Sequence, residues 1–315
     1  MLAEKQYLAV DSGGSKTIWV LLKETGEPLK KFQTAGLGAV KEGILPVRET
    51  VAEAFRTIAT ADEPDGIFLS LGGPNVAEVK NALENAWPNI PIQVEREACG
   101  DAMLAAAKFL GCSAVVMCGT GSVAVGDTAS GRKYAGGWGP IYGDGGSGGG
   151  MGTQALRLFL RSYDVPDDLG ELSALFSPLT EGIDPSTFAG RMELKRRALD
   201  INRRDLAALA PKIYHLAEKG DKTALSLYDS ATEEIVRLAL GVSDDTEDFH
   251  ILLCGGFFTG KPLLLEQCRR KMRSLSHASL QYEPRFSPVV AAQMATLSLG
   301  GVPVTQSLFQ KLLQN

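Results

Sequence analysis

Short hydrophobic runs and longer amphipathic segments alternate along the first third of the chain. Runs rich in Val, Ile and Leu predict strands, and apolar residues at spacings of three and four predict helices. The predicted strands cover residues 8–11, 17–22, 29–32, 66–70 and 90–94, and the predicted helices cover residues 45–60, 77–87 and 98–109. A three-stranded meander followed by alternating helix and strand indicates an α/β domain.

A similar series of elements starts again after residue 111. A strand over 114–118, the turn Gly119-Thr120-Gly121-Ser122 and a strand over 123–125 repeat the strand, glycine turn and strand of residues 8–22. We therefore predict two duplicated domains, over residues 1–111 and 112–315, with the two turns facing each other across a cleft.

The middle of the second predicted domain has a helical pattern. Apolar residues at helical spacing in 154–160, 206–217 and 231–240 predict a helical insertion over about residues 151–245. The α/β pattern then resumes with strands over 249–254 and 278–282 and helices over 263–273 and 288–299. We leave open whether the last helix packs back on the first domain.

Composition narrows the classes of function and location. The net charge of −5 gives no basic surface for nucleic acid or an anionic membrane, so we expect neither partner. No apolar run reaches the length of a membrane span, and the first residues lack the core of a signal peptide, so we expect a cytoplasmic protein. The five cysteines are odd in number and form no Cys-x-x-Cys pair, which predicts reduced core thiols. With only three scattered histidines, we expect no zinc site.

The most informative motif interrupts the first apolar run. Asp11-Ser12-Gly13-Gly14-Ser15-Lys16-Thr17 stands between the first two predicted strands. Two glycines permit a tight turn, including one with positive φ, whose amides can face an anion. Asp11 can hold a hydrated Mg²⁺, because this ion prefers oxygen ligands and keeps several waters. The alternative is an ordinary hairpin with a polar turn and a solvated lysine.

Two further glycine turns follow predicted strands. Gly119-Thr120-Gly121-Ser122 offers backbone amides and two hydroxyls, which suit phosphate oxygens. Gly255-Gly256-Phe257 begins a segment that approximates a P-loop through Lys261, but Pro262 stands where that motif needs Ser or Thr for Mg²⁺. We therefore expect this turn to lie against a nucleobase or ribose, with Phe257 as a packing residue.

Asp101 begins a predicted helix of small and apolar residues. A carboxylate in the first turn interacts favourably with the helix dipole, which is a purely structural explanation. The functional alternative is a general base that accepts the proton of an attacking hydroxyl.

Residues 136–150 hold nine glycines. Such a density indicates close approach of the backbone to a ligand or to another element. The G-x-G-x-x-G spacing over 143–148 does not indicate a dinucleotide site, because no strand leads into it and Asp144 occupies its centre. From its residue type alone, Trp138 is expected in the core rather than as a platform for a sugar ring.

Taken in order, six motifs resemble those of one known group. They are Asp11 to Thr17, Asp101-Ala102, Gly119 to Ser122, Gly136-Gly137-Trp138-Gly139, Gly143-Asp144-x-Gly-Ser-Gly and Gly255-Gly256-Phe257. From its first strand to its last helix, the chain resembles the N-acetylglucosamine kinase and BadF/BadG/BcrA/BcrD ATPase family. The resemblance implies an actin-like ATPase fold, in which two ribonuclease-H-like domains close over ATP and a hexose.

The resemblance also implies a role for each motif. Asp101 matches the catalytic base that activates the 6-hydroxyl of an amino sugar or related hexose, in a kinase that uses ATP and Mg²⁺. The implied ATP-binding positions are Gly13, Gly14, Ser15, Lys16, Thr17, Gly119, Thr120, Gly121, Ser122, Gly255, Gly256 and Phe257. The implied sugar-binding positions are Gly137, Trp138, Gly139 and Asp144. The expected partner is a small-molecule sugar, and a homodimer is left open.

Two departures from the family pattern concern the sugar. The loop Gly36-Leu37-Gly38-Ala39 lacks the asparagine usual in the sugar kinases, and Gly145 replaces the usual glutamate after Asp144. Missing polar partners change sugar discrimination, so the particular sugar is not predicted.

Two other functions remain as alternatives to a kinase, an ATPase activator and a non-enzymatic ATP switch. An ATPase activator of a dehydratase needs cysteines placed around an iron–sulfur cluster, which these five do not show. A non-enzymatic ATP switch would show no release of ADP stimulated by a sugar.

Overall fold

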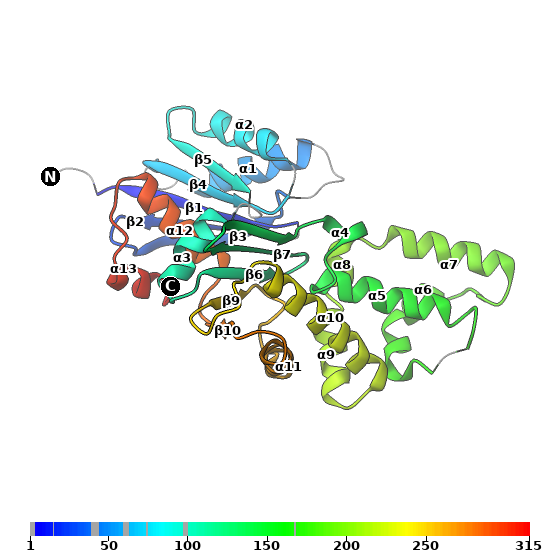
Figure 1. Ribbon diagram of the computed structural model, residues 1–315. Coiled ribbons are helices and arrows are strands. Elements are labelled where there is room, and N and C mark those ends of the chain that lie inside the picture. The colour runs from blue at the N-terminus through cyan, green and yellow to red at the C-terminus, as the bar shows by residue number, and fades with distance from the viewer. Residues whose placement is uncertain are drawn as a thin grey trace. The chain divides into compact units, whose positions relative to one another are not determined.

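The computed structural model describes residues 4–14, 16–38, 44–58, 63–73, 75–96, 100–166 and 168–315 (Figure 1). Ser15, Cys99 and Ala39 therefore lie outside the described residues. The chain forms two compact units. Unit 1 comprises residues 1–115, 125–132 and 281–315, and unit 2 comprises residues 116–124 and 133–280. The division at residue 111 stays a prediction.

A five-stranded sheet organises unit 1. Its strands are β1 (Gln6–Ser12), β2 (Lys16–Lys23), β3 (Pro28–Ala35), β4 (Gly66–Leu71) and β5 (Ile92–Arg96), in the order β3-β2-β1-β4-β5. Strands β1, β2 and β3 pair antiparallel, whereas β4 runs parallel to both β1 and β5. The carboxyl ends of β1, β4 and β5 therefore meet at one edge of the sheet.

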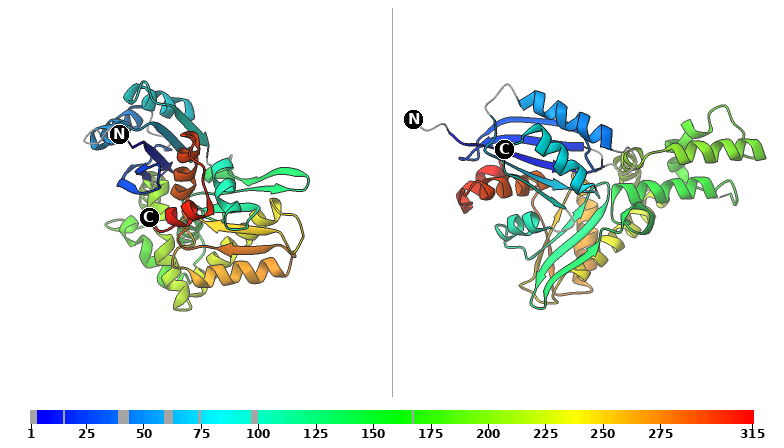
Figure 2. Two further views of the ribbon diagram at one scale, coloured as in Figure 1. Left: turned by 90° about the vertical axis from the view of Figure 1, so that its left-hand side faces the viewer. Right: turned by 90° about the horizontal axis from the view of Figure 1, so that it is seen from above.

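Helices cover both faces of this sheet (Figure 2). Helices α1 (Ile44–Ile58) and α2 (Val76–Ala86) enclose a core with one face, which includes Trp19 and Trp87. Helices α3 (Asp101–Lys108) and α12 (Pro288–Leu299) lie on the other face, where α12 packs against β1 and β4, and α13 (Gln306–Leu312) follows. The alternation of side chains along β1 supplies both cores, because successive residues point to opposite faces.

The second sheet has the order β10-β9-β6-β7-β8. Its strands are β6 (Ala114–Cys118), β7 (Ser122–Thr128), β8 (Gly131–Gly136), β9 (His250–Cys254) and β10 (Ser279–Tyr282). When the strands of each sheet are numbered along the chain, both sheets have the same spatial order, which is third, second, first, fourth and fifth. Hairpin strands and later crossover strands take the same places in the two sheets.

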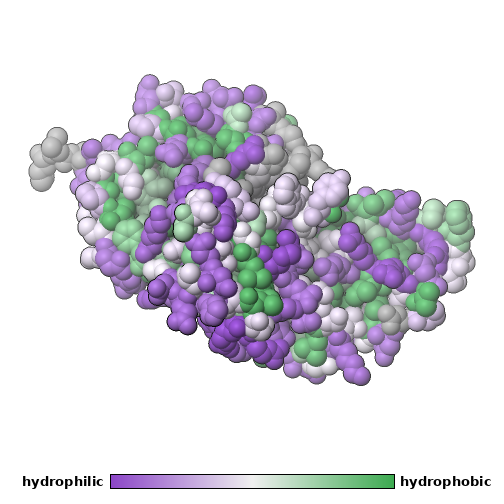
Figure 3. Space-filling model, viewed as in Figure 1, coloured by the Kyte–Doolittle hydropathy of each residue, from purple (hydrophilic) through white to green (hydrophobic). Residues whose placement is uncertain are grey.

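Helices make up most of unit 2 after β8 (Figure 1). They are α4 (Gly139–Tyr142), α5 (Gly148–Arg161), the 3₁₀ helix η2 (Gly170–Phe176), α6 (Ser177–Thr180), α7 (Phe188–Asp200), α8 (Arg203–Ala207), α9 (Ala210–Glu218), α10 (Lys222–Gly241) and α11 (Pro262–Arg273). Within the described ranges, none of the helices is long and apolar enough to cross a membrane. On the face drawn in Figure 3, hydrophobic residues form small groups between polar ones.

The four described cysteines, Cys112, Cys118, Cys254 and Cys268, are buried free thiols. Burial raises the pKa of Cys112 to about 11 and that of Cys268 to about 12. This confirms the expectation of core thiols for these four positions.

Candidate functional site

The first glycine turn lies at the carboxyl end of β1. Gly13 N donates to Lys16 O at 3.0 Å, which closes the turn between β1 and β2. A Cβ atom added at Gly13 or Gly14 would meet nothing within 4 Å, and neither residue has positive φ. Neither glycine therefore adopts the left-handed conformation that the sequence permitted, and both leave open space over their backbone. Lys16 is exposed at the start of β2.

Two buried hydroxyls hold this turn in place. Ser12 Oγ and Thr17 Oγ1 lie 2.7 Å apart, and Leu37 N donates to Ser12 Oγ at 3.0 Å. Thr17 Oγ1 also donates to Ala35 O at 2.8 Å, and Gly38 N donates to Gly13 O at 3.3 Å. Thr17 thus supports the turn from inside, and its expected contact with phosphate stays a prediction. Leu37 and Gly38 thus pack directly on the first turn.

Asp101 lies near the same edge of the unit 1 sheet, because it follows β5 as the first residue of α3. Its side chain is 67% exposed, and Arg132 Nη1 donates to its Oδ1 at 2.5 Å. Arg132 in turn binds Asp127 through Nε at 2.5 Å, and Lys108 Nζ lies 3.0 Å from Asp127. These carboxylates raise the pKa of Arg132, so the cation beside Asp101 is permanent. An accessible carboxylate with a fixed orientation can accept a proton from a bound hydroxyl.

The second glycine turn belongs to unit 2 and is held by the start of α5. Gly148 N donates to Gly119 O at 2.9 Å, and Gly149 N donates to Thr120 O at 3.2 Å. Ser147 caps α5 by accepting from Gly150 N, and its hydroxyl donates to Thr120 O at 3.0 Å. A Cβ atom on Gly149 would lie 2.4 Å from Thr120 O. The glycine density of this segment thus permits close approach to another backbone, as predicted.

Asp144 supports the second turn from the other side. It is buried and has a φ of +65°, and its Oδ1 accepts from Ser122 N at 2.9 Å. Arg203 Nη2 donates to Asp144 Oδ2 and also to Thr120 O at 3.2 Å. The carboxylate of Asp144 thus contacts other protein groups. Its contact with a sugar stays a prediction. Nothing in the sequence pattern marks Arg203, which lies one residue after the Asn202 cap of α8.

The third glycine turn meets the second inside unit 2. Phe257 N donates to Cys118 O at 3.0 Å, and a Cβ atom on Gly255, whose φ is +104°, would lie 2.3 Å from that oxygen. Phe257 is buried and stacks on Tyr228, which confirms it as a packing residue. Gly256 has open space over its backbone.

Lys261 is buried beside two aromatic rings. Its Nζ lies 5.6 Å from the centre of the Phe257 ring and 5.9 Å from that of Tyr214. Burial lowers the pKa of Lys261. This environment agrees with the expectation that the P-loop likeness of the segment is incidental, which stays a prediction.

The Gly136–Gly139 loop and the helix α4 that follows it carry exposed hydrophobic side chains. Trp138 is 74% exposed, and Ile141 and Tyr142 of α4 are exposed as well. The expectation of a core tryptophan is wrong. The positive φ of Gly136, Gly137 and Gly139 turns this segment out of β8, so its side chains leave the sheet.

Comparison of the sequence with known protein families supports the family predicted from these motifs. The model of the BadF/BadG/BcrA/BcrD ATPase family matches residues 8–292. The chain belongs to this family. The match covers all the motifs on which the resemblance was based, and it confirms the family predicted from them.

Two relatives of the chain are named as kinases. The N-acetyl-D-glucosamine kinase of Dictyostelium discoideum is 26% identical over 86% of this chain and 91% of its own length. The N-acetylmuramic acid/N-acetylglucosamine kinase of Clostridium acetobutylicum is 24% identical over 73% of this chain and 77% of its own length. A solved structure of a candidate N-acetylglucosamine kinase from Chromobacterium violaceum has a TM-score of 0.71, with 22% identity over 92% of this chain and 98% of that one. The chain therefore shares the fold of that structure.

Proposed function

We propose that the protein transfers the γ-phosphoryl group of ATP to a hydroxyl of an amino sugar or related hexose, with O6 as the acceptor. The observation that carries this proposal is that an open glycine turn and a carboxylate both follow strands that end at one edge of the unit 1 sheet. The open turn at Gly13-Gly14 follows β1, and the carboxylate of Asp101 follows the parallel strand β5. Ligands of α/β sheets bind outside the carboxyl ends of the strands, where a phosphate turn and a base can act together.

The described residues fit ATP and Mg²⁺. Gly13, Gly14, Gly119 and Gly256 have open space over their backbones, which leaves room for phosphate or ribose. Asp11 is a half-buried carboxylate at the end of β1, and a single carboxylate plus waters and phosphates suits Mg²⁺. When bound, Mg²⁺ would neutralise charge on the phosphates. In this proposal, Asp101 accepts the proton of the attacking hydroxyl and Lys16 pairs with a phosphate oxygen.

The equal strand orders of the two sheets support a duplicated ribonuclease-H-like fold. We propose that helices α5 to α10 are an insertion between β8 and β9 of the second copy. This arrangement places the second and third glycine turns after β6 and β9, which correspond to β1 and β4 of unit 1.

A panel of free sugars tests the proposed activity. ADP release should be measured with hexoses, amino sugars, N-acetyl sugars and muramic acid derivatives. We expect one class to stimulate release strongly, and no stimulation by any of them would contradict a sugar kinase. The panel includes muramic derivatives because the Clostridium relative is named for both sugars.

Asp101→Asn tests the role of the base. The substitution keeps the shape of the side chain but removes its basicity, so kcat should fall by roughly 10²–10⁴-fold while ATP affinity barely changes. If Asp101 serves only the helix dipole, turnover stays near normal and the loss of stability is only about 0.3–1 kcal/mol. Measurement of kcat, ATP affinity and Tm on this one variant separates the two roles.

A further inference from the structure

Helix α3, which carries Asp101, begins without a cap of its own. Its N-cap residue is Gly100, which has a φ of +69° and offers no side chain to the free amides of the first turn. A Cβ atom at this position would lie 2.2 Å from Cγ1 of Val125. No Ser, Thr, Asp or Asn fits at position 100 without rearrangement, so the cap must come from another element.

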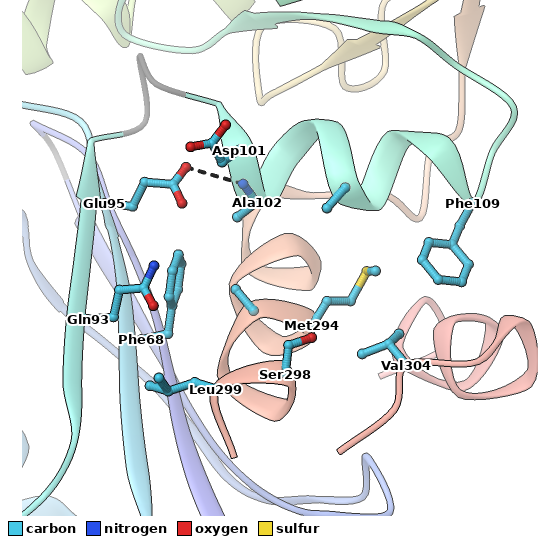
Figure 4. A pocket seen from close by; sticks show the side chains of 12 residues that line it. Phe68, Gln93, Glu95, Asp101, Ala102, Phe109, Met294, Ser298, Leu299 and Val304 are labelled. Carbon is cyan, nitrogen blue, oxygen red and sulfur yellow. Dashed lines mark hydrogen bonds between the residues drawn. The ribbon is translucent and has the colours of Figure 1, made fainter. Parts of the chain in front are cut away.

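Glu95 supplies that cap from the neighbouring strand. It lies near the end of β5, and its Oε1 accepts from Ala102 N at 3.2 Å. Figure 4 shows the carboxylate directed across a cavity at the first turn of α3, beside Asp101. The cavity has a volume of about 570 Å³ and is also lined by Gln93, Phe109 and Met294.

The hydrogen bond from Ala102 N stabilises the charged form of Glu95 as well as the start of the helix. Burial raises the pKa of Glu95, and the nearby charge of Asp101 raises it further. The amide of Ala102 opposes both effects, as does the charge of Arg132. A carboxylate brought into this half-buried position is therefore stabilised by the amide that it caps and by the helix dipole.

We propose that Glu95 is a positioning residue for Asp101. Glu95 fixes the backbone of the first turn, and Arg132 holds the side chain of Asp101. The proposal rests on the proposed kinase function, in which a small displacement of the base costs much of the rate. Glu95 does not touch the reacting atoms in this scheme.

Two substitutions at position 95 separate positioning from catalysis. Glu95→Ala removes the acceptor, so kcat should fall by roughly 10- to 100-fold with little change in the KM for ATP. Glu95→Gln keeps an acceptor oxygen but has no basicity, so most of the rate should return. A Gln variant as inactive as Asp101→Asn would make Glu95 the base itself and overturn the proposal.

Thr305→Ala is the matched control. Thr305 caps α13 in the same unit and accepts from Leu308 N at 3.2 Å, the same length as the Glu95 contact. Both alanine variants should lower Tm slightly, but only Glu95→Ala should lower kcat. An equal kcat in the two variants would show that Glu95 is an ordinary helix cap.

Amide hydrogen exchange tests the cap without any assay of activity. Exchange of the Ala102 amide should accelerate roughly tenfold or more in Glu95→Ala and stay slower in Glu95→Gln, because the acceptor oxygen is lost only in the former. Unchanged exchange in Glu95→Ala would overturn the proposal. If exchange accelerates in Glu95→Ala but the wild-type protein phosphorylates no sugar, the capping role of Glu95 is supported and the proposed kinase function is contradicted.

Discussion

The two glycine turns at Gly13-Gly14 and Gly119–Ser122 have similar sequences but different supports. The first is held by its own strand ends, through the hydroxyls of Ser12 and Thr17 and the loop at Leu37. The second is held by segments far along the chain, through the start of α5 and the pair of Asp144 and Arg203. A phosphate turn can thus be stabilised locally or by tertiary packing, and the two cases should respond differently to mutation.

Loss of Asp144 should have the largest effect on stability. Asp144→Ala leaves Ser122 N without its acceptor and Arg203 without its carboxylate. Because Asp144 is buried but Arg203 is partly exposed, we expect a loss of about 2–3 kcal/mol in the free energy of unfolding. Urea unfolding measures this loss.

Asp164→Ala is the control for that substitution. Asp164 accepts from Arg191 at 2.6 Å, but both side chains are exposed, so the expected loss is only about 0–1 kcal/mol. Equal losses in the two variants would show that Asp144 is no more than a surface ion pair and does not support the second turn.

The next largest effect comes from adding a methyl group at each turn. Gly149→Ala forces a Cβ atom against Thr120 O, so α5 or the second turn must shift at a cost of about 1–3 kcal/mol. Gly13→Ala meets no protein atom and should leave Tm within a degree or two of wild type by the usual scaling.

Gly13→Ala should affect ATP binding although it barely affects stability. The methyl group of Gly13→Ala projects into the space proposed for phosphate, so ATP affinity should fall by roughly tenfold, the equivalent of one lost hydrogen bond. Calorimetric titration with ATP checks this. Wild-type affinity in Gly13→Ala would mean that the open space of the first turn is not the phosphate site.

The local support of the first turn explains why that region could be predicted from sequence. Both strands and their turn are adjacent in the chain, and the observed β1, β2 and β4 extend the predicted segments by only a few residues. The apolar strands β6 and β9 and helices α11 and α12 were also predicted, because their patterns are strong and continuous.

Elements stabilised by distant contacts were not predictable in this way. Strand β8 is polar and glycine-bounded, and α5 was predicted only over 154–160 because it begins within a glycine run of low helix propensity. Helix α7 is largely polar, and the short α13 also escaped prediction. For these elements, packing and caps such as Ser147, Thr187 and Thr305 outweigh local preference.

The site shows the same division. Asp11, Asp101 and the glycine turns carry signals of residue type and spacing, whereas Glu95, Arg132 and Arg203 become informative only through their contacts. Ser147 had a usable signal, since a serine that precedes a helix is a standard cap. Trp138 was misplaced because residue type alone does not show that glycines of positive φ turn it outward.

A pair of lysines near glycine turns gives an effect on binding of similar size. Lys16 is exposed beside the open first turn, and Lys261 is buried near the third. Lys16→Met should weaken ATP binding by roughly tenfold through loss of one charged contact, whereas Lys261→Met should bind ATP normally. Weaker binding in Lys261→Met alone would restore the P-loop interpretation and contradict the role given to the first turn.

The smallest expected effect is a change in how stability depends on pH. Because burial lowers the pKa of Lys261, the unfolded chain binds more protons than the folded protein between that lowered pKa and the ordinary value of 10.5. The free energy of unfolding therefore gains a positive slope with pH in this window from Lys261 alone. Lys261→Met removes that contribution, so the difference between wild type and variant should shift in favour of wild type as pH rises toward 10.5. Urea unfolding of both proteins across this range isolates the lysine, because other titrating groups cancel in the difference. A difference that stays constant would mean that Lys261 reaches water in the folded protein, and it would then be free to meet a phosphate after all.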